Sequence, residues 1–113
     1  MSAEAEAAGY VRVADRGEVP LHGALVVTVG SYDVAIFDLG GALVAYENAC
    51  PHQGGPIGEG CVQGTTVTCP WHAWCFDLRT GSLTIGAFAR LRPFAVCESG
   101  GGVYLSPSPV EEP

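Results

Sequence analysis

The stretch that decides the fold contains two short motifs, Cys50-Pro51-His52 and Cys69-Pro70-Trp71-His72, with sixteen residues between His52 and Cys69. Each motif supplies one cysteine and one histidine. A zinc finger usually keeps its two cysteines together and its two histidines together. The alternating order suits instead a site with two metal ions, in which one ion takes both sulfurs and the other takes both nitrogens.

The two motifs resemble the cluster-binding loops of Rieske proteins, and the resemblance extends beyond the ligands. It covers Cys50-Pro51-His52-Gln53-Gly54-Gly55 and Cys69-Pro70-Trp71-His72-Ala73-Trp74-Cys75-Phe76-Asp77. Such a protein holds a [2Fe–2S] cluster, with two histidines replacing two cysteines on one iron. The resemblance implies one Rieske [2Fe–2S] cluster per chain, with no catalytic residue. The expected metal ligands are Cys50, His52, Cys69 and His72.

Composition and pattern predict an all-β fold. Sixteen glycines and eight prolines indicate many tight turns, and no segment shows a helical period. Short apolar or alternating runs predict strands, and the run Ala24–Val29 is apolar enough for a strand covered on both faces. The expected strands are residues 10–13, 24–29, 34–37, 43–46, 65–68, 74–77, 95–97 and 103–105.

The domain organisation follows from where these strands stop and resume. We expect a flexible tail at residues 1–8, a Rieske domain at 9–106 and a second flexible tail at 107–113. Turn residues crowd the middle of the chain, so residues 47–88 are predicted to form a cluster-binding subdomain. The resemblance implies a Rieske-like antiparallel β-sandwich base into which this loop-rich subdomain is inserted. A length of 113 residues suggests one domain, with no room for an oxygenase or reductase domain.

Charge and hydropathy exclude several partner classes. The net charge is −7, lysine is absent and there are five arginines, so a row of nucleic-acid phosphates could not be neutralised. No apolar run approaches the ~18 residues that a membrane-spanning helix needs. The acidic start, Met1-Ser2-Ala3-Glu4-Ala5-Glu6, does not resemble a secretory signal. We therefore expect a cytoplasmic protein, in which an odd set of five cysteines favours metal binding over disulfides.

Four positions in the two loops bear on the reduction potential. In high-potential relatives each loop carries an extra cysteine besides the ligand, and the two extra cysteines form a disulfide. Gly55 and Trp71 stand at the matching positions here. Those relatives also carry a serine and a tyrosine that donate hydrogen bonds to cluster or ligand sulfur; Trp74 and Phe76 replace them. Fewer donors stabilise the reduced cluster less. We expect a potential at the low end of the Rieske range, about −150 mV.

The resemblance is strongest to the small ferredoxins of bacterial ring-hydroxylating dioxygenase systems. It implies a monomeric one-electron carrier between an NAD(P)H-dependent flavin reductase and a terminal oxygenase. Both partners would dock near His52 and His72. Two alternatives remain at this point. The chain could be the Rieske small subunit of a larger oxidoreductase such as an assimilatory nitrite reductase, or the four residues could hold one structural zinc.

Several other residues are open to two readings. Cys61 follows a glycine-rich turn and should be exposed, where it could be a reactive thiol; Cys75 and Cys97 should be small buried hydrophobes in strands. Trp71 and Trp74 could pack against the loop or form a docking surface. Relatives cover the cluster with a third, proline-containing loop, whereas Gly86-Ala87-Phe88-Ala89 has no proline. Phe88 is a candidate to take that place, Asp77 should fix a turn and His22 should be a surface histidine in a turn.

Overall fold

The computed structural model describes residues 9–49, 55–70, 74–84 and 89–110. These residues form antiparallel strands and two short 3-10 turns, and no α-helix is present among them. The turns are η1 (Arg16–Glu18) and η2 (Ile57–Glu59). The strands are β1 (Val11–Asp15), β2 (Ala24–Val29), β3 (Tyr32–Asp38), β4 (Leu43–Glu47), β5 (Cys61–Gln63), β6 (Thr66–Thr68), β7 (Cys75–Asp77), β8 (Pro93–Phe94), β9 (Val96–Ser99) and β10 (Gly102–Leu105).

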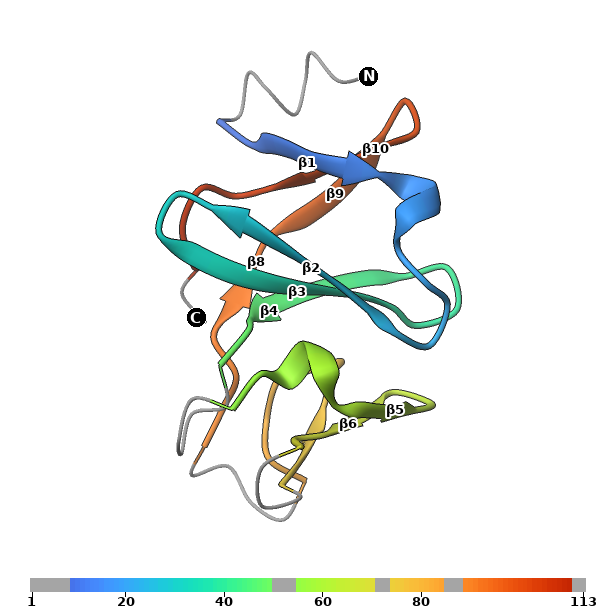
Figure 1. Ribbon diagram of the computed structural model, residues 1–113, viewed down its shortest axis with the longest axis vertical. Helices are drawn as coiled ribbons and strands as arrows, with labels where there is room; N and C mark the ends of the chain where they lie inside the picture. The colour runs from blue at the N-terminus through green and yellow to red at the C-terminus, as the bar shows by residue number, and fades with distance from the viewer. Residues whose placement is uncertain (1–8, 50–54, 71–73, 85–88, 111–113) are drawn as a thin grey trace.

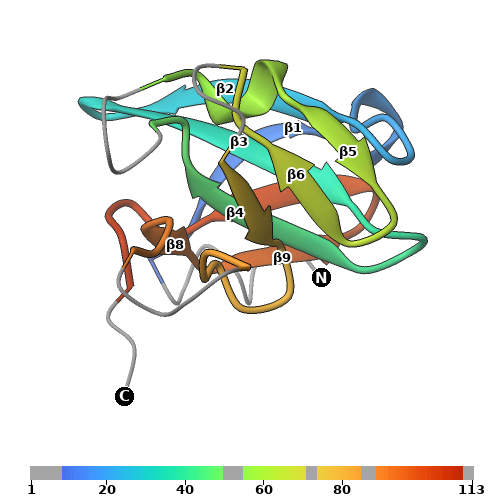
Figure 2. The same ribbon diagram turned by 90° about the horizontal axis from the view of Figure 1, so that it is seen from below.

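The strands make three sheets, stacked along the long axis of the molecule (Figure 1). The end sheet has the order β1-β10-β9, the middle sheet β2-β3-β4-β8 and the loop sheet β5-β6-β7. Strand β1 pairs with β10, so the two ends of the chain meet in the end sheet. The loop sheet comes from the chain between β4 and β8, and β5 and β6 lie across the middle sheet in Figure 2. The predicted β base with an inserted, loop-rich subdomain is therefore confirmed.

Two hydrophobic clusters hold the three sheets together, one on each face of the middle sheet. Strand β3 contributes to both because successive side chains of a strand point to opposite faces. Val34 and Ile36 join the cluster toward the end sheet, whereas Ala35 and Phe37 join the cluster toward the loop sheet. The second of these, here called the loop-side cluster, contains Ala35, Phe37, Tyr46, Ile57, Val67, Cys69, Phe76, Leu78, Leu83 and Leu91.

One expectation about burial is wrong. Residues Ala24–Val29 do form a strand, but β2 lies at the edge of the middle sheet and Val26 is 42% exposed. The strand covered on both faces is β3, in which Val34–Phe37 are fully buried. The apolar run alone could not decide this, because coverage depends on a strand's place in the sheet and not on its own composition.

Strands β5 and β8 and the two 3-10 turns were not predicted. Strand β8 has only two residues, too few to show a period, and β5 has a single aliphatic residue, Val62, between two turn glycines, Gly60 and Gly64. The other expected strands agree with the structure to within about two residues, the usual uncertainty of element boundaries. Glycine turns lie where the sequence predicted them, for instance at Gly40 and Gly41, with φ of 94° and 109°.

The predicted C-terminal tail begins at residue 107, and the chain still contacts the base beyond that point. The backbone N–H of Val110 donates to the Pro93 carbonyl at 2.9 Å, and the Ser106 hydroxyl donates to the Ser108 carbonyl. The domain boundaries stay a prediction, and residues 1–8 and 111–113 lie outside the described residues. Across the part that the structure describes, no helix is long and apolar enough to cross a membrane.

Candidate metal centre

Of the four predicted ligands, the structure describes Cys69. Cys50, His52 and His72 lie outside the described residues. Cys69 directly follows β6, is 1% exposed and has a free thiol. Its backbone N–H donates to the Trp74 carbonyl at 2.7 Å, which extends the pairing of β6 with β7 by one step. Cys69, the first residue of the second motif, therefore continues the β6–β7 hairpin one step beyond β6.

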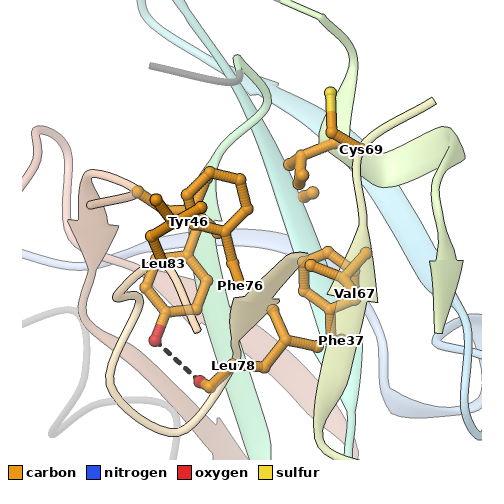
Figure 3. Close-up of a cluster of buried hydrophobic side chains, with 10 residues drawn as sticks. Phe37, Tyr46, Val67, Cys69, Phe76, Leu78 and Leu83 are labelled. Atoms are coloured by element: carbon orange, nitrogen blue, oxygen red, sulfur yellow. Dashed lines mark hydrogen bonds between the residues drawn. The ribbon is translucent and has the colours of Figure 1, made fainter. Parts of the chain in front are cut away.

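The loop-side cluster lies behind this thiol. Figure 3 shows the Cys69 sulfur pointing away from Phe37, Val67 and Phe76, which pack on the other side of its Cβ. Trp74 packs against the same cluster. The chain before and after the second motif is thus anchored in an apolar core. This core excludes water from the interior side of the Cys69 thiol.

The same cluster reaches the chain next to the other two loops. Ile57 follows the first motif and is fully buried. Leu83 and Ala89 flank the third loop, and both belong to or pack against the cluster, with the Leu83 N–H donating to the Ala89 carbonyl at 3.0 Å. Phe88, the candidate cover for the cluster, lies outside the described residues. One apolar core therefore supports the described ends of all three loops.

Hydrogen bonds also fix the approach to the first motif. The Asn48 N–H donates to the Asp33 carbonyl at 2.8 Å, and the Asn48 side-chain oxygen accepts from the Gly58 N–H at 2.6 Å. Because Asn48 precedes Cys50 and Gly58 follows Gly54, this second bond joins the chain before the loop to the chain after it. Sequence reasoning missed Asn48, since a single Asn beside a motif gives no local signal of its distant partner.

A tight turn follows the second motif. Asp77 accepts a hydrogen bond from the Arg79 N–H at 2.9 Å, and the Arg79 side chain holds the pKa of the Asp77 carboxyl below its ordinary range. The prediction that Asp77 fixes a turn is confirmed. The Tyr46 hydroxyl donates to the Leu78 carbonyl at 2.7 Å, the dashed line in Figure 3. The turn is therefore fastened to β4 of the middle sheet.

Trp74 and Phe76, the two positions where high-potential relatives are expected to carry hydroxyl donors, have side chains without a hydroxyl group. Phe76 is fully buried in the loop-side cluster, and its ring centroid lies 6.5 Å from that of Trp74. Gly55 is also buried, and Trp71 lies outside the described residues. Trp74 is half-buried and packs against the cluster, which supports the packing interpretation of this residue.

The three other cysteines and His22 show no sign of a further metal site. Cys61 is exposed, as predicted, whereas Cys75 and Cys97 are half-buried in β7 and β9 rather than fully buried. The Cys75 sulfur lies 3.4 Å from the Thr68 hydroxyl. His22 is exposed in a turn with φ of 57°. Among the described residues no cluster of His, Cys, Asp or Glu forms a further metal site.

All five arginines have partners within the fold. Arg16 joins Asp38 at 3.0 Å and Glu98 at 2.9 Å, which ties the middle sheet to the end sheet. The other pairs are Arg12 with Asp15, Arg79 with Asp77, Arg90 with the Thr80 carbonyl and Arg92 with Glu47. Four of the five positive side chains are thus paired with carboxylates, which leaves little positive charge to bind phosphates.

Comparisons with known proteins agree with this geometry. Residues 9–94 match the Rieske [2Fe-2S] domain family. The chain is 35% identical over 78 residues to the 3-phenylpropionate/cinnamic acid dioxygenase ferredoxin subunit of Photorhabdus laumondii, a match that spans 67% of this chain and 74% of that protein. A chain in the complex of reduced oxygenase and oxidized ferredoxin in carbazole 1,9a-dioxygenase superposes with a TM-score of 0.82 at 25% identity, covering 91% of this chain and 97% of that one. A protein proposed to be an NADPH nitrite reductase small subunit shares the fold, with a TM-score of 0.74 at 17% identity.

Fold and loops thus define an iron–sulfur electron-transfer protein. The chain belongs to the Rieske [2Fe–2S] domain family, with ferredoxin components of dioxygenase systems among its relatives. Its cofactor is a Rieske [2Fe–2S] cluster, and the one predicted ligand that the structure describes fits it, because a buried, free thiol such as that of Cys69 is the kind of soft donor that iron in such a cluster requires. The predictions of family, fold and cofactor are confirmed, while the ligand set stays a prediction.

Proposed function

We propose that the chain is a one-electron carrier that takes electrons from an NAD(P)H-dependent flavin reductase and delivers them to a terminal oxygenase. The observation that carries this proposal is the match to a dioxygenase ferredoxin subunit over most of both chains. The fold shared with a ferredoxin that was solved in complex with its oxygenase supports it. A carrier needs no catalytic residue of its own, and its task is to hold the redox group near the surface.

The bound cluster would supply the chemistry by accepting and releasing one electron. Cys50 and Cys69 would hold the inner iron, and His52 and His72 would hold the outer one. Two thiolates balance the charge of the oxidised cluster, whereas four would leave two negative charges, so histidine ligation raises the potential. The apolar side chains packed around Cys69 would exclude water from the iron held by the cysteines. Electron exchange with partners would therefore take place at the iron held by the histidines.

The potential should lie at the low end of the Rieske range, about −150 mV. Phe76 and Trp74 offer no hydroxyl to the cluster or its ligands, and Phe76 is fully buried in the loop-side cluster. A low reduction potential suits a series of electron carriers in which NAD(P)H is the first electron donor.

Both partners should dock near His52 and His72, and the carrier should be a cytoplasmic monomer. The net charge of −7 can attract a basic docking patch over a long range. Carriers must also release quickly, so each interface should bury less than about 1,200 Å².

The proposal is tested with the purified protein under anaerobic conditions. The oxidised protein should be red-brown, bleach with dithionite and give a rhombic EPR signal. It should then carry electrons from a flavin reductase to an oxygenase of the dioxygenase class in a reconstituted assay. A colourless protein that holds one zinc would contradict the proposal. A Rieske protein that is stable only in a nitrite reductase complex would favour the alternative, for which the shared fold is the sole support.

A further inference from the structure

Two side chains at the end of β4 reach the described ends of both ligand loops. Asn48 accepts from the Gly58 N–H at 2.6 Å, across the first loop. Two residues earlier, the buried Tyr46 hydroxyl donates to the Leu78 carbonyl at 2.7 Å, in the turn after the second loop. Tyr46 of β4 and Asn48, which directly follows β4, therefore contact the segments that leave both loops.

Close backbone packing continues the first of these connections. A Cβ at Gly58 would lie 2.6 Å from Val26 Cγ2 and 3.0 Å from the Asn48 side-chain oxygen. A Cβ at Gly60 would lie 2.2 Å from the Thr68 carbonyl oxygen. Thr68 precedes Cys69, so the segment that leaves the first loop presses against the base on one side and against the strand bearing Cys69 on the other.

The second connection is equally close. A Cβ at Gly81 would lie 2.8 Å from the Tyr46 ring, and Gly81 has φ of 80°. The Leu91 N–H donates to the Gly81 carbonyl at 2.7 Å, which adds the chain after the third loop to the same contact. The Tyr46 ring thus lies where the second and third loops return to the base.

We propose that Asn48 and Tyr46 are positioning residues that hold the two ligand loops in register with each other. Both side chains act through backbone groups of the loops' exits, and neither is a metal ligand. No disulfide can join the loops at Gly55 and Trp71, where no thiol is present, so apart from the ligand bonds of the cluster itself their separation depends on noncovalent contacts. This inference rests on the proposed ligands Cys50, His52, Cys69 and His72.

The test compares Asn48→Ala, Asn48→Asp and Tyr46→Phe with the wild-type full chain. Asn48→Asp keeps an acceptor oxygen for the Gly58 N–H, and Tyr46→Phe keeps the ring while removing the donor. Ser106→Ala is the matched control, because the Ser106 hydroxyl also accepts a part-buried backbone N–H, that of Ala95 at 3.0 Å, but it follows β10 of the end sheet. The readouts are the EPR g values of the reduced protein and the rate of cluster loss to a chelator.

Asn48→Ala and Tyr46→Phe should each lose the cluster about tenfold faster, the effect of one lost buried hydrogen bond. They should also shift or broaden the g values, since the loops no longer hold one separation. Asn48→Asp should restore both readouts, and Ser106→Ala should match the wild type.

Wild-type g values and loss rates in both Asn48→Ala and Tyr46→Phe would overturn the inference. If Asn48→Ala does not fold, Tyr46→Phe decides alone, because it changes a single oxygen atom. A wild-type protein with no Rieske signal would instead overturn the proposed function and the inference with it, so the two failures can be told apart.

Discussion

Phe76 and Trp74 occupy two positions that are expected to influence the reduction potential although neither is a proposed cluster ligand. Both follow His72 by a few positions, at places where the resemblance to Rieske proteins implies hydroxyl donors in high-potential relatives. In this chain they supply ring packing instead, with Phe76 at the centre of the loop-side cluster (Figure 3).

Phe76→Tyr should raise the reduction potential by on the order of 50 mV. One added hydrogen bond to a sulfur ligand stabilises the reduced form by about 1 kcal/mol, and 59 mV corresponds to a factor of ten for one electron. Potentiometric titration measures the shift. Phe94→Tyr is the control, because Phe94 lies in the cluster on the opposite face of the middle sheet and should leave the potential unchanged. An equal shift in both variants would show that the hydroxyl does not act on the cluster.

His72→Ala should abolish the Rieske absorption and EPR spectra. The chain has three histidines, and the one that is not a proposed ligand, His22, provides the control. His22 is exposed in a turn, so His22→Ala should keep both spectra. A His72→Ala protein that retains a rhombic Rieske signal would disprove the ligand assignment.

At the scale of elements, η2 and the loop sheet are positioned by close backbone contact. Gly60 has φ of −77° and ψ of 170°, a conformation open to any residue. Glycine is needed there for steric reasons, because a side chain would meet the Thr68 carbonyl.

Gly60→Ala should therefore destabilise the protein by about 1–3 kcal/mol, the usual effect of overpacking. It should also speed cluster loss, since the displaced backbone adjoins Cys69. Urea unfolding and chelator kinetics measure the two effects. Gly17→Ala is the matched control: its Cβ would meet nothing within 4 Å, and Gly17 has no positive φ. If both variants behave alike, the contact with Thr68 is not a constraint.

At the scale of the whole molecule, Asp38 joins two sheets. It ends β3, is 6% exposed and accepts hydrogen bonds from the Gly40 and Gly41 N–H groups and from Arg16. Through Arg16 it is linked to Glu98 on β9 of the end sheet. The backbone N–H of Gly41 and the Arg16 guanidinium hold the pKa of Asp38 below its ordinary 3.8.

This lowered pKa predicts acid-sensitive stability. A carboxyl with a depressed folded-state pKa contributes stability that is fully present above the unfolded-state pKa and is lost as the pH falls through the folded-state value. Asp38→Asn should therefore be less stable than the wild type at pH 7, by about 1–3 kcal/mol for hydrogen bonds to a charged group. The difference should shrink below pH of about 4. Urea midpoints across pH 3–7 measure it, and a constant difference would contradict the linkage.

The sequence by itself determined the class of this protein. The order and spacing of Cys50, His52, Cys69 and His72 can be recognised without knowledge of the fold. The family match confirms the class of protein that they indicate. The all-β architecture was also predictable, because alternation in strands and glycine in turns are local signals.

Only the tertiary structure decided which elements lie where. It made β3 and not β2 the strand covered on both faces, and it formed β5 and β8 from segments with no strand pattern of their own. It also paired Asn48 with Gly58 and Tyr46 with Leu78. The two side-chain hydrogen bonds join residues ten and thirty-two positions apart, and such contacts cannot be recognised from the local sequence pattern because that pattern reports only neighbouring residues.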